Sequence, residues 1–105
     1  MSSKNFVPVV YKAGFTTGTT VTTSSVSAAI SIPLDANGTT ARHLMLSATA
    51  ACHINLSNST GTSATAGDLM VQAGDRLCLD SRGATAISYI QDSASGKLNI
   101  APLEA

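Results

Sequence analysis

The sequence predicts an all-β domain, an antiparallel β-sandwich or barrel built from seven to eight short strands. Apolar and polar residues alternate with a period of two through most of the chain, as in strands that bury one face. Gly, Asn and Asp interrupt this alternation at intervals of roughly ten residues, which is typical of an all-β fold. No long stretch shows the three- and four-residue apolar spacing of a helix. A chain of 105 residues is about the size of one domain.

The strands of the first half are indicated by three alternating segments. From residue 26 to residue 34 every second residue is apolar, and the sequence Asp-Ala-Asn-Gly at 35–38 then predicts a turn. The segments 44–48 and 52–56 follow the same rule. In each segment we expect one face to lie in the core and the other in solvent. The core face would carry these residues: Val26, Ala28, Ile30, Ile32, Leu34, Leu44, Leu46, Ala48, Cys52, Ile54 and Leu56.

The second half of the chain continues this pattern with four more strands. They are predicted around residues 69–71, 77–79, 87–90 and 98–100, separated by turns at 73–75, 80–83 and 92–96. Four aspartates stand at the expected strand ends: Asp68, Asp75, Asp80 and Asp92. Asp side chains stabilise turns by bonding to nearby backbone groups, so we interpret these as turn residues rather than as acid–base or calcium-binding groups.

The first 25 residues differ from the rest, so we divide the chain into an extended N-terminal arm or loop at 1–25 and a β-sandwich at 26–105. Residues 14–25 are low in complexity and lack large apolar anchors. Such a segment is either a flexible terminus or an arm that orders only against a neighbouring subunit. The apolar stretch 6–11 favours the arm and could add an eighth strand, which Pro8 would confine to an edge. The predicted interface with a neighbouring subunit is therefore Phe6, Val7, Val9, Val10, Tyr11 and Phe15.

Composition argues against several function classes. Six basic and six acidic residues leave no net charge, and the basic residues are scattered, whereas nucleic-acid binding relies on clustered Lys and Arg. No apolar run approaches the ~18 residues needed to cross a bilayer, and the first residues do not resemble a secretory signal. Trp is absent and large residues are scarce, so we expect a thin core and a homo-oligomer that supplies part of the stability.

No catalytic, cofactor-binding or metal-binding group is predicted. In a hairpin pairing Leu44 with Ile54, His43 and His53 would be diagonal neighbours on the outer face, but zinc needs three or four protein ligands. We therefore interpret both as surface histidines. Cys52 and His53 are adjacent on one strand and point to opposite faces, which argues against a Cys–His couple. Cys52 and Cys78 are expected to be reduced, partly buried thiols, with a disulfide between them as the open alternative.

Four segments of the last two-thirds of the chain carry a resemblance to a known group of proteins. They are Ala41-Arg-His-Leu-Met-Leu46, the run 64–79, the run 84–91, and Gly96-Lys-Leu-Asn-Ile-Ala-Pro-Leu103. In this order the chain resembles small jelly-roll-like virion proteins of tailed bacteriophages, the head decoration or cement proteins. The resemblance implies a jelly-roll-like sandwich that sits on the outer capsid surface and clamps neighbouring subunits of the major capsid protein. It further implies a dimer or trimer without a cofactor, located on the virion after assembly in the host cytoplasm.

Two hypotheses of function are compared. The first is a structural virion protein that decorates the capsid, with weak contacts multiplied over the lattice. The alternative is a tail- or fibre-associated module that binds a carbohydrate or receptor, against which the lack of Trp counts because sugar recognition relies on exposed aromatic platforms. A tail-tube or head-completion component would share the same predicted fold.

Overall fold

The structure, a computed structural model, describes residues 12–13 and 17–104 of the chain. These residues form strands and connections without a helix, which confirms the predicted all-β class. The predicted interface residues Phe6, Val7, Val9, Val10, Tyr11 and Phe15 lie outside the described residues. The nine strands are β1 (Lys12–Ala13), β2 (Thr19–Thr22), β3 (Ala28–Ser31), β4 (His43–Ala48), β5 (Cys52–Ser57), β6 (Leu69–Val71), β7 (Arg76–Asp80), β8 (Ala86–Gln91) and β9 (Lys97–Glu104).

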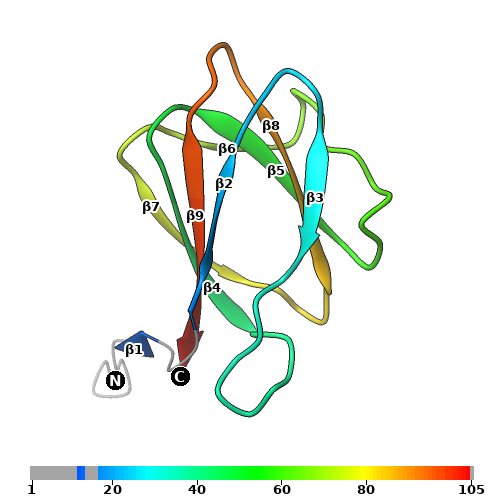
Figure 1. Ribbon diagram of the computed structural model, residues 1–105, viewed down its shortest axis with the longest axis vertical. Helices are drawn as coiled ribbons and strands as arrows, with labels where there is room; N and C mark the ends of the chain where they lie inside the picture. The colour runs from blue at the N-terminus through cyan, green and yellow to red at the C-terminus, as the bar shows by residue number, and fades with distance from the viewer. Residues whose placement is uncertain (1–11, 14–16, 105) are drawn as a thin grey trace, which may run out of the picture.

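The strands form two antiparallel sheets that face each other (Figure 1). In sheet A, β1 and β2 both pair with β9, which is followed by β4 and then by β7 at the edge. In sheet B the order is β3, β8, β5, β6. The chain passes from one sheet to the other at most connections, and only β5 and β6 are consecutive neighbours in one sheet.

The hydrophobic core lies between the inner faces of the two sheets. In β4 every second residue is buried, so Leu44 and Leu46 point inward while His43, Met45 and Ser47 point outward. Leu46 stands between Leu77 of β7 and Ile100 of β9 and is fully buried. The alternation that predicted these strands therefore does mark their core faces. The core cluster comprises Ile32, Ala41, Leu44, Leu46, Ala48, Cys52, Ile54, Val71, Ile87, Tyr89, Leu98 and Ile100.

The segment 26–34 contributes less to the core than its alternation predicted. Strand β3 covers only residues 28–31, and Ile32 is the one residue of the alternating set that is fully buried. Val26 is 72% exposed and Leu34 is 50% exposed, so the prediction that both lie on the core face was wrong. Both residues stand outside the strand, where the chain no longer holds their side chains against the opposite sheet. The prediction was also wrong for Ala28, which is exposed at the start of β3.

Part of the range expected to form an arm belongs to sheet A. Strand β2 lies within residues 1–25 and pairs with β9, with Val21 opposite Leu98. The buried Thr23 follows it, and its Oγ1 accepts a bond from the Gly96 amide at 3.0 Å. Sheet A thus includes residues on the N-terminal side of residue 26. The sequence of β2 is Thr-Thr-Val-Thr, in which β-branched residues favour a strand but large apolar residues are missing.

The two sheets differ in what lies on their outer faces. The connection 58–68 between β5 and β6 folds over sheet B, beside β8 and β3 (Figure 1). Ser88 on the outer face of β8 donates to the carbonyl of Thr62, and the amide of Ala64 donates to Ser27 Oγ at 2.8 Å. As a result Ser88 and Ala86 are buried although they point away from the core. The chain's own connection therefore covers the outer face of sheet B over β8 and part of β5, whereas Ser31 of β3 and Met70 of β6 stay exposed.

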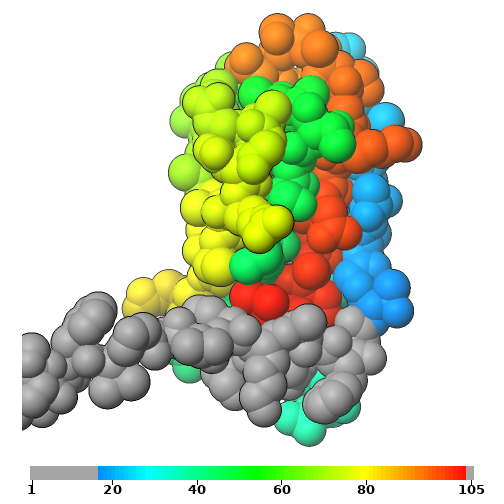
Figure 2. All heavy atoms as spheres, turned by 90° about the vertical axis from the view of Figure 1, so that its left-hand side faces the viewer, coloured from blue at the N-terminus to red at the C-terminus, as the bar shows by residue number. Residues whose placement is uncertain are grey.

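The outer face of sheet A is open over its four main strands. Figure 2 shows β2 (blue), β9 (red), β4 (green) and β7 (yellow) reaching the surface side by side. Met45, Ser47 and Asn99 are half-buried on this face, and Thr20 and Cys78 are exposed. Within the described residues, the outer face of sheet B is consequently covered in part and the outer face of sheet A is not covered.

Candidate functional site

His53 lies in a buried polar cluster on the outer side of β5. Its side chain is enclosed by the 58–68 connection, and the residue is only 4% exposed. Nδ1 is 3.0 Å from the carbonyl oxygen of Asp68, and Nε2 is 2.8 Å from Oδ1 of Asp92. The prediction of a surface histidine was therefore wrong for His53, because the connection that covers it has no apolar periodicity to reveal its path. The side chain does face away from the core, as strand parity predicted.

The chemistry open to His53 is limited by these two contacts. Both ring nitrogens face acceptors, so the doubly protonated ring can donate to each of them. The bond to Asp92 and the bond to the Asp68 carbonyl raise the pKa of His53. A histidine acting as a general base needs one ring nitrogen free to accept a proton from a substrate or nucleophile. His53 therefore serves to join three segments: β5, the start of β6 and the turn after β8.

His43 and His53 do not share a site. The two residues lie on outer faces of different sheets, since β4 belongs to sheet A and β5 to sheet B. The hairpin pairing of Leu44 with Ile54 was wrong, because Leu44 is opposite Leu79 and Pro102, and Ile54 is opposite Tyr89 and Leu69. Within residues 12–13 and 17–104, no three His, Cys, Asp or Glu side chains are placed to hold a metal ion.

The two cysteines are free thiols in very different surroundings. Cys52 is buried in the core, and burial raises the pKa of its thiol, so the neutral and unreactive form is favoured. Cys78 lies on the outer face of β7 and is exposed, not partly buried as predicted. The prediction that Cys52 and Cys78 are free thiols is confirmed, and the two residues do not form a disulfide in the structure.

Two of the four aspartates at the strand ends accept bonds from nearby backbone amides. Asp68 Oδ2 accepts from the amide of Thr65 at 2.7 Å, and Asp80 Oδ1 accepts from the amide of Arg82 at 2.8 Å. The bond to the Arg82 amide and the nearby Arg42 guanidinium hold the pKa of Asp80 below its ordinary value. The turn interpretation is confirmed for Asp68 and Asp80. The carboxylate of Asp92 differs, because it bonds to the His53 ring.

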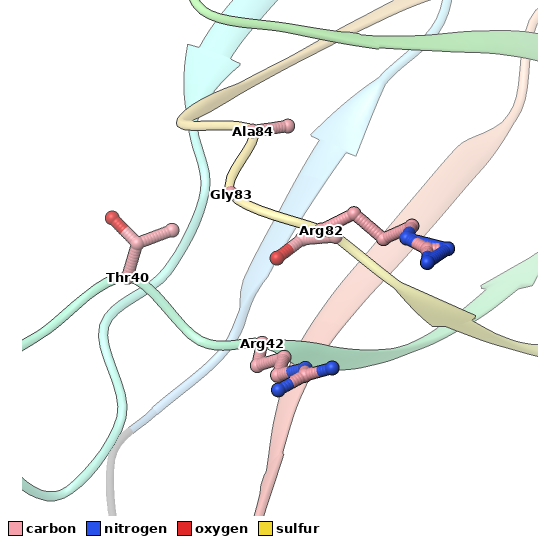
Figure 3. Close-up of a pocket in the computed structure, with 6 residues that line it drawn as sticks. Thr40, Arg42, Arg82, Gly83 and Ala84 are labelled. Atoms are coloured by element: carbon pink, nitrogen blue, oxygen red, sulfur yellow. The ribbon is translucent and has the colours of Figure 1, made fainter.

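A surface hollow of about 470 Å³ lies beside the turn that follows β7 (Figure 3). It is lined by Thr40, Arg42, Ser81, Arg82, Gly83 and Ala84. Figure 3 shows the guanidinium groups of Arg42 and Arg82 lying apart and both extending away from Thr40. Arg42 is already paired with Asp80 at 3.3 Å, and the Arg42 side chain is 73% exposed. A ligand site normally has polar groups that converge on one point, and this hollow lacks such convergence.

The outer face of sheet A is the most extensive candidate surface. We define the sheet A face as the outward residues Thr20, Met45, Ser47, Cys78, Asn99 and Ala101. The strand register aligns these residues in two rows. The apolar row crosses β9, β4 and β7 and consists of Ala101, Met45 and Cys78. The polar row crosses β2, β9 and β4 and consists of Thr20, Asn99 and Ser47. Asn99 Nδ2 donates to Thr20 Oγ1 at 3.0 Å, which holds the polar row together. The same outer side also carries the charged residues Arg76, Asp80 and Lys97, and Arg76 extends the polar row because it is opposite Ser47. The six residues of the sheet A face therefore form an uncharged centre with charged residues at its border.

Sequence reasoning assigned the interface to residues 6–15 and did not single out this face. The outward residues of β4 and β9 could be read from parity, but their alignment depends on pairing between strands about fifty residues apart. No local pattern encodes that pairing.

Comparisons with known proteins give no relative from which a role can be transferred. A scan against protein-family models, a search of curated proteins and a search of solved structures each found no match to this chain. Among the residues that the structure describes, there is also no helix long and apolar enough to cross a membrane.

Proposed function

We propose that this protein is a non-catalytic structural protein of a virus particle, a capsid decoration protein that binds the outer surface of a phage head. In this proposal the sheet A face rests on the major capsid protein and bridges neighbouring subunits. The observation that carries the proposal is the difference between the two sheets. The 58–68 connection covers part of the outer face of sheet B, whereas no described segment covers the uncharged centre of the outer face of sheet A.

The strand order supports a jelly roll, the finer fold expected from the resemblance. Strands β2 to β9 pair as a folded hairpin, in which β2 meets β9, β3 meets β8, β4 meets β7, and β5 meets β6. The contacts of β4 with β9 and of β5 with β8 then close two four-stranded sheets, with β1 as an addition to sheet A. Jelly rolls of eight strands occur in viral capsid proteins and in lectins, so the fold is compatible with both hypotheses of function.

The character of the sheet A face favours a protein partner. Interfaces between proteins are depleted in charge at their centre and enriched in Met, which is flexible enough to adapt to an opposing surface. Met45 occupies the middle of the apolar row, between the small side chains of Ala101 and Cys78. The face offers no aromatic platform on which a sugar ring could stack. A weak contact of this kind would be strengthened when many copies bind one lattice.

A co-sedimentation assay with purified phage heads stripped of decoration tests this proposal. We expect saturable binding in a simple ratio to capsid subunits. Replacing Ala101 with arginine should weaken binding at least about tenfold, because an unpaired charge would be forced against an uncharged surface. The matched control is Ala94→Arg, since Ala94 is exposed in the turn between β8 and β9 and outside the sheet A face.

Either of two results would contradict the proposal. Well-folded protein that does not bind heads at all would exclude a decoration role, and binding to glycans instead would support the tail or fibre alternative. Equal binding by Ala101→Arg and Ala94→Arg would exclude the sheet A face as the contact surface. A deletion of residues 1–11 in the same assay tests the predicted interface residues 6–11 separately and leaves β1 and β2 intact.

A further inference from the structure

Strand β7 is the longest edge strand among the described residues. It pairs with β4 on one side, and no other described strand pairs with it. Its five residues exceed the two to four residues of the other edge strands β1, β2, β3 and β6. The strand contains neither proline nor glycine, and Figure 1 shows it at the border of the sandwich. An edge of this kind can accept another strand through its backbone groups.

The ladder between β4 and β7 determines which backbone groups face the edge. The amide of Ser81 donates to the carbonyl of Arg42 at 2.6 Å, one step beyond the pair of Asp80 with His43. Backbone bonds alternate along an antiparallel pair, so Leu77 and Leu79 turn their amides and carbonyls toward β4. The amides and carbonyls of Arg76, Cys78 and Asp80 therefore point away from β4, toward the free edge.

The sequence of β7 is self-complementary about its centre. The strand reads Arg-Leu-Cys-Leu-Asp, with a positive and a negative residue at equal distances from Cys78. A two-fold axis beside Cys78 would place Arg76 of one copy opposite Asp80 of the other, twice in the same interface. It would also place Leu77 opposite Leu79. Arg76 is exposed and has no ion-pair partner among the described residues, so the second copy would provide one.

We propose that β7 pairs antiparallel with β7 of a second copy of this chain, centred on Cys78, and joins two sheets A into one continuous sheet. Cys78 would be directly opposite its counterpart in a hydrogen-bonded pair, with Cα atoms about 5.5 Å apart. Disulfide bonds require Cα separations of about 4.4–6.8 Å, so a mild oxidant would be able to link the two thiols. With dissolved oxygen as the oxidant, the two thiols would lose two protons and two electrons to form one disulfide, and the oxygen would be reduced to hydrogen peroxide. The dimer itself needs no disulfide.

This inference does not rest on the proposed function. The dimer would place the sheet A faces of both copies on the same side of one sheet, which suits binding to a repeating surface. A protein that dimerises through β7 but ignores phage heads would refute only the decoration role. A monomer that binds heads would refute only the dimer.

Sedimentation velocity under reducing conditions tests the dimer. Two variants are compared with the unmodified protein, one with serine and one with proline in place of Cys78. We expect a dimer for the unmodified protein and for Cys78→Ser, and a monomer for Cys78→Pro. Proline removes the amide that faces the free edge without removing a bond to β4, so the strand should persist. Far-UV circular dichroism checks that Cys78→Pro is folded. A monomeric unmodified protein, or a dimer unaffected by Cys78→Pro, would overturn the proposal.

A charge variant and a crosslink keep the test decisive if Cys78→Pro fails to fold. Arg76→Glu would place like charges opposite each other twice, and the dissociation constant of the dimer should rise about tenfold. Mild oxidation should link the unmodified protein through Cys78. It should not link the double variant Cys78→Ser, Ser31→Cys, which moves the exposed thiol to the edge strand of the other sheet. An unchanged dissociation constant, or equal crosslinking by both proteins, would contradict the pairing of β7 with itself.

Discussion

Replacing Leu46 with alanine is expected to lower the free energy of unfolding by about 2–5 kcal/mol. Leu46 is fully buried at the centre of sheet A, between Leu77 and Ile100, and its side chain packs toward the inner face of sheet B. Removing three carbon atoms there leaves a cavity that rigid neighbouring strands can fill only in part. The chain has no Trp and few other large side chains, so no neighbour is well suited to expand into the space. Urea unfolding followed by circular dichroism measures the loss.

The matched control for this substitution is Leu69→Ala. Leu69 is 51% exposed in β6, so the same chemical change should cost under about 1 kcal/mol. Both variants are measured at one protein concentration, because dimerisation would add a concentration-dependent contribution. Equal losses for the two variants would mean that the core does not lie between the sheets as described.

Replacing His53 with alanine is expected to cost about 1–3 kcal/mol near neutral pH and to make the stability less dependent on pH. The variant loses the bonds from the ring to Asp92 and to the carbonyl of Asp68. These bonds raise the pKa of His53 in the folded state. A raised folded pKa contributes stability that is fully present below the unfolded pKa of about 6.5 and is lost as the pH rises through the folded value. The difference between the unmodified protein and the variant should thus be larger at about pH 5.5 than at about pH 8.5.

Asp92→Asn provides the control for this pH dependence. The amide retains an oxygen acceptor and nearly the same shape, but the negative charge that favours the protonated ring is gone. We expect the unfolding free energy of Asp92→Asn to change less between the two pH values than that of the unmodified protein. A His53→Ala variant whose loss of stability is the same at both pH values would contradict the proposed charge state of the ring.

The strands could be predicted from the sequence where apolar residues alternate with polar ones, as they do most clearly in β4. Alternation in β4 identified Leu44 and Leu46 as core residues without knowledge of any neighbouring strand. Pairing could not be predicted in the same way, because parity determines which face a residue occupies and not which strand lies beside it. The short link at 49–51 resembled a hairpin turn, yet it carries the chain from sheet A to sheet B. His43 and His53 therefore lie on different sheets and are not neighbours.

The burial of polar residues was the other feature that could not be predicted from the sequence. Ser88 and His53 lie on an outward face, and parity alone predicts that they are exposed. They are buried because the 58–68 connection bonds to that face through single polar contacts, such as the bond from Ser88 to the carbonyl of Thr62. A connection made mostly of Ser, Thr, Gly and Ala has no apolar periodicity from which its position could be inferred. The difference between the two sheets, on which the proposed function depends, therefore emerges only in three dimensions.

Oxidative footprinting of the two methionines on opposite sheets tests the proposed docking surface most directly. Met45 lies on the sheet A face, and Met70 lies on β6 of sheet B, where it is 36% exposed. Oxidation to the sulfoxide adds one oxygen atom and is read by mass spectrometry for the free protein and for the protein bound to phage heads. We expect binding to protect Met45 several-fold and to leave Met70 unchanged. Protection of Met70 without protection of Met45, or of neither in a saturated complex, would contradict docking through sheet A.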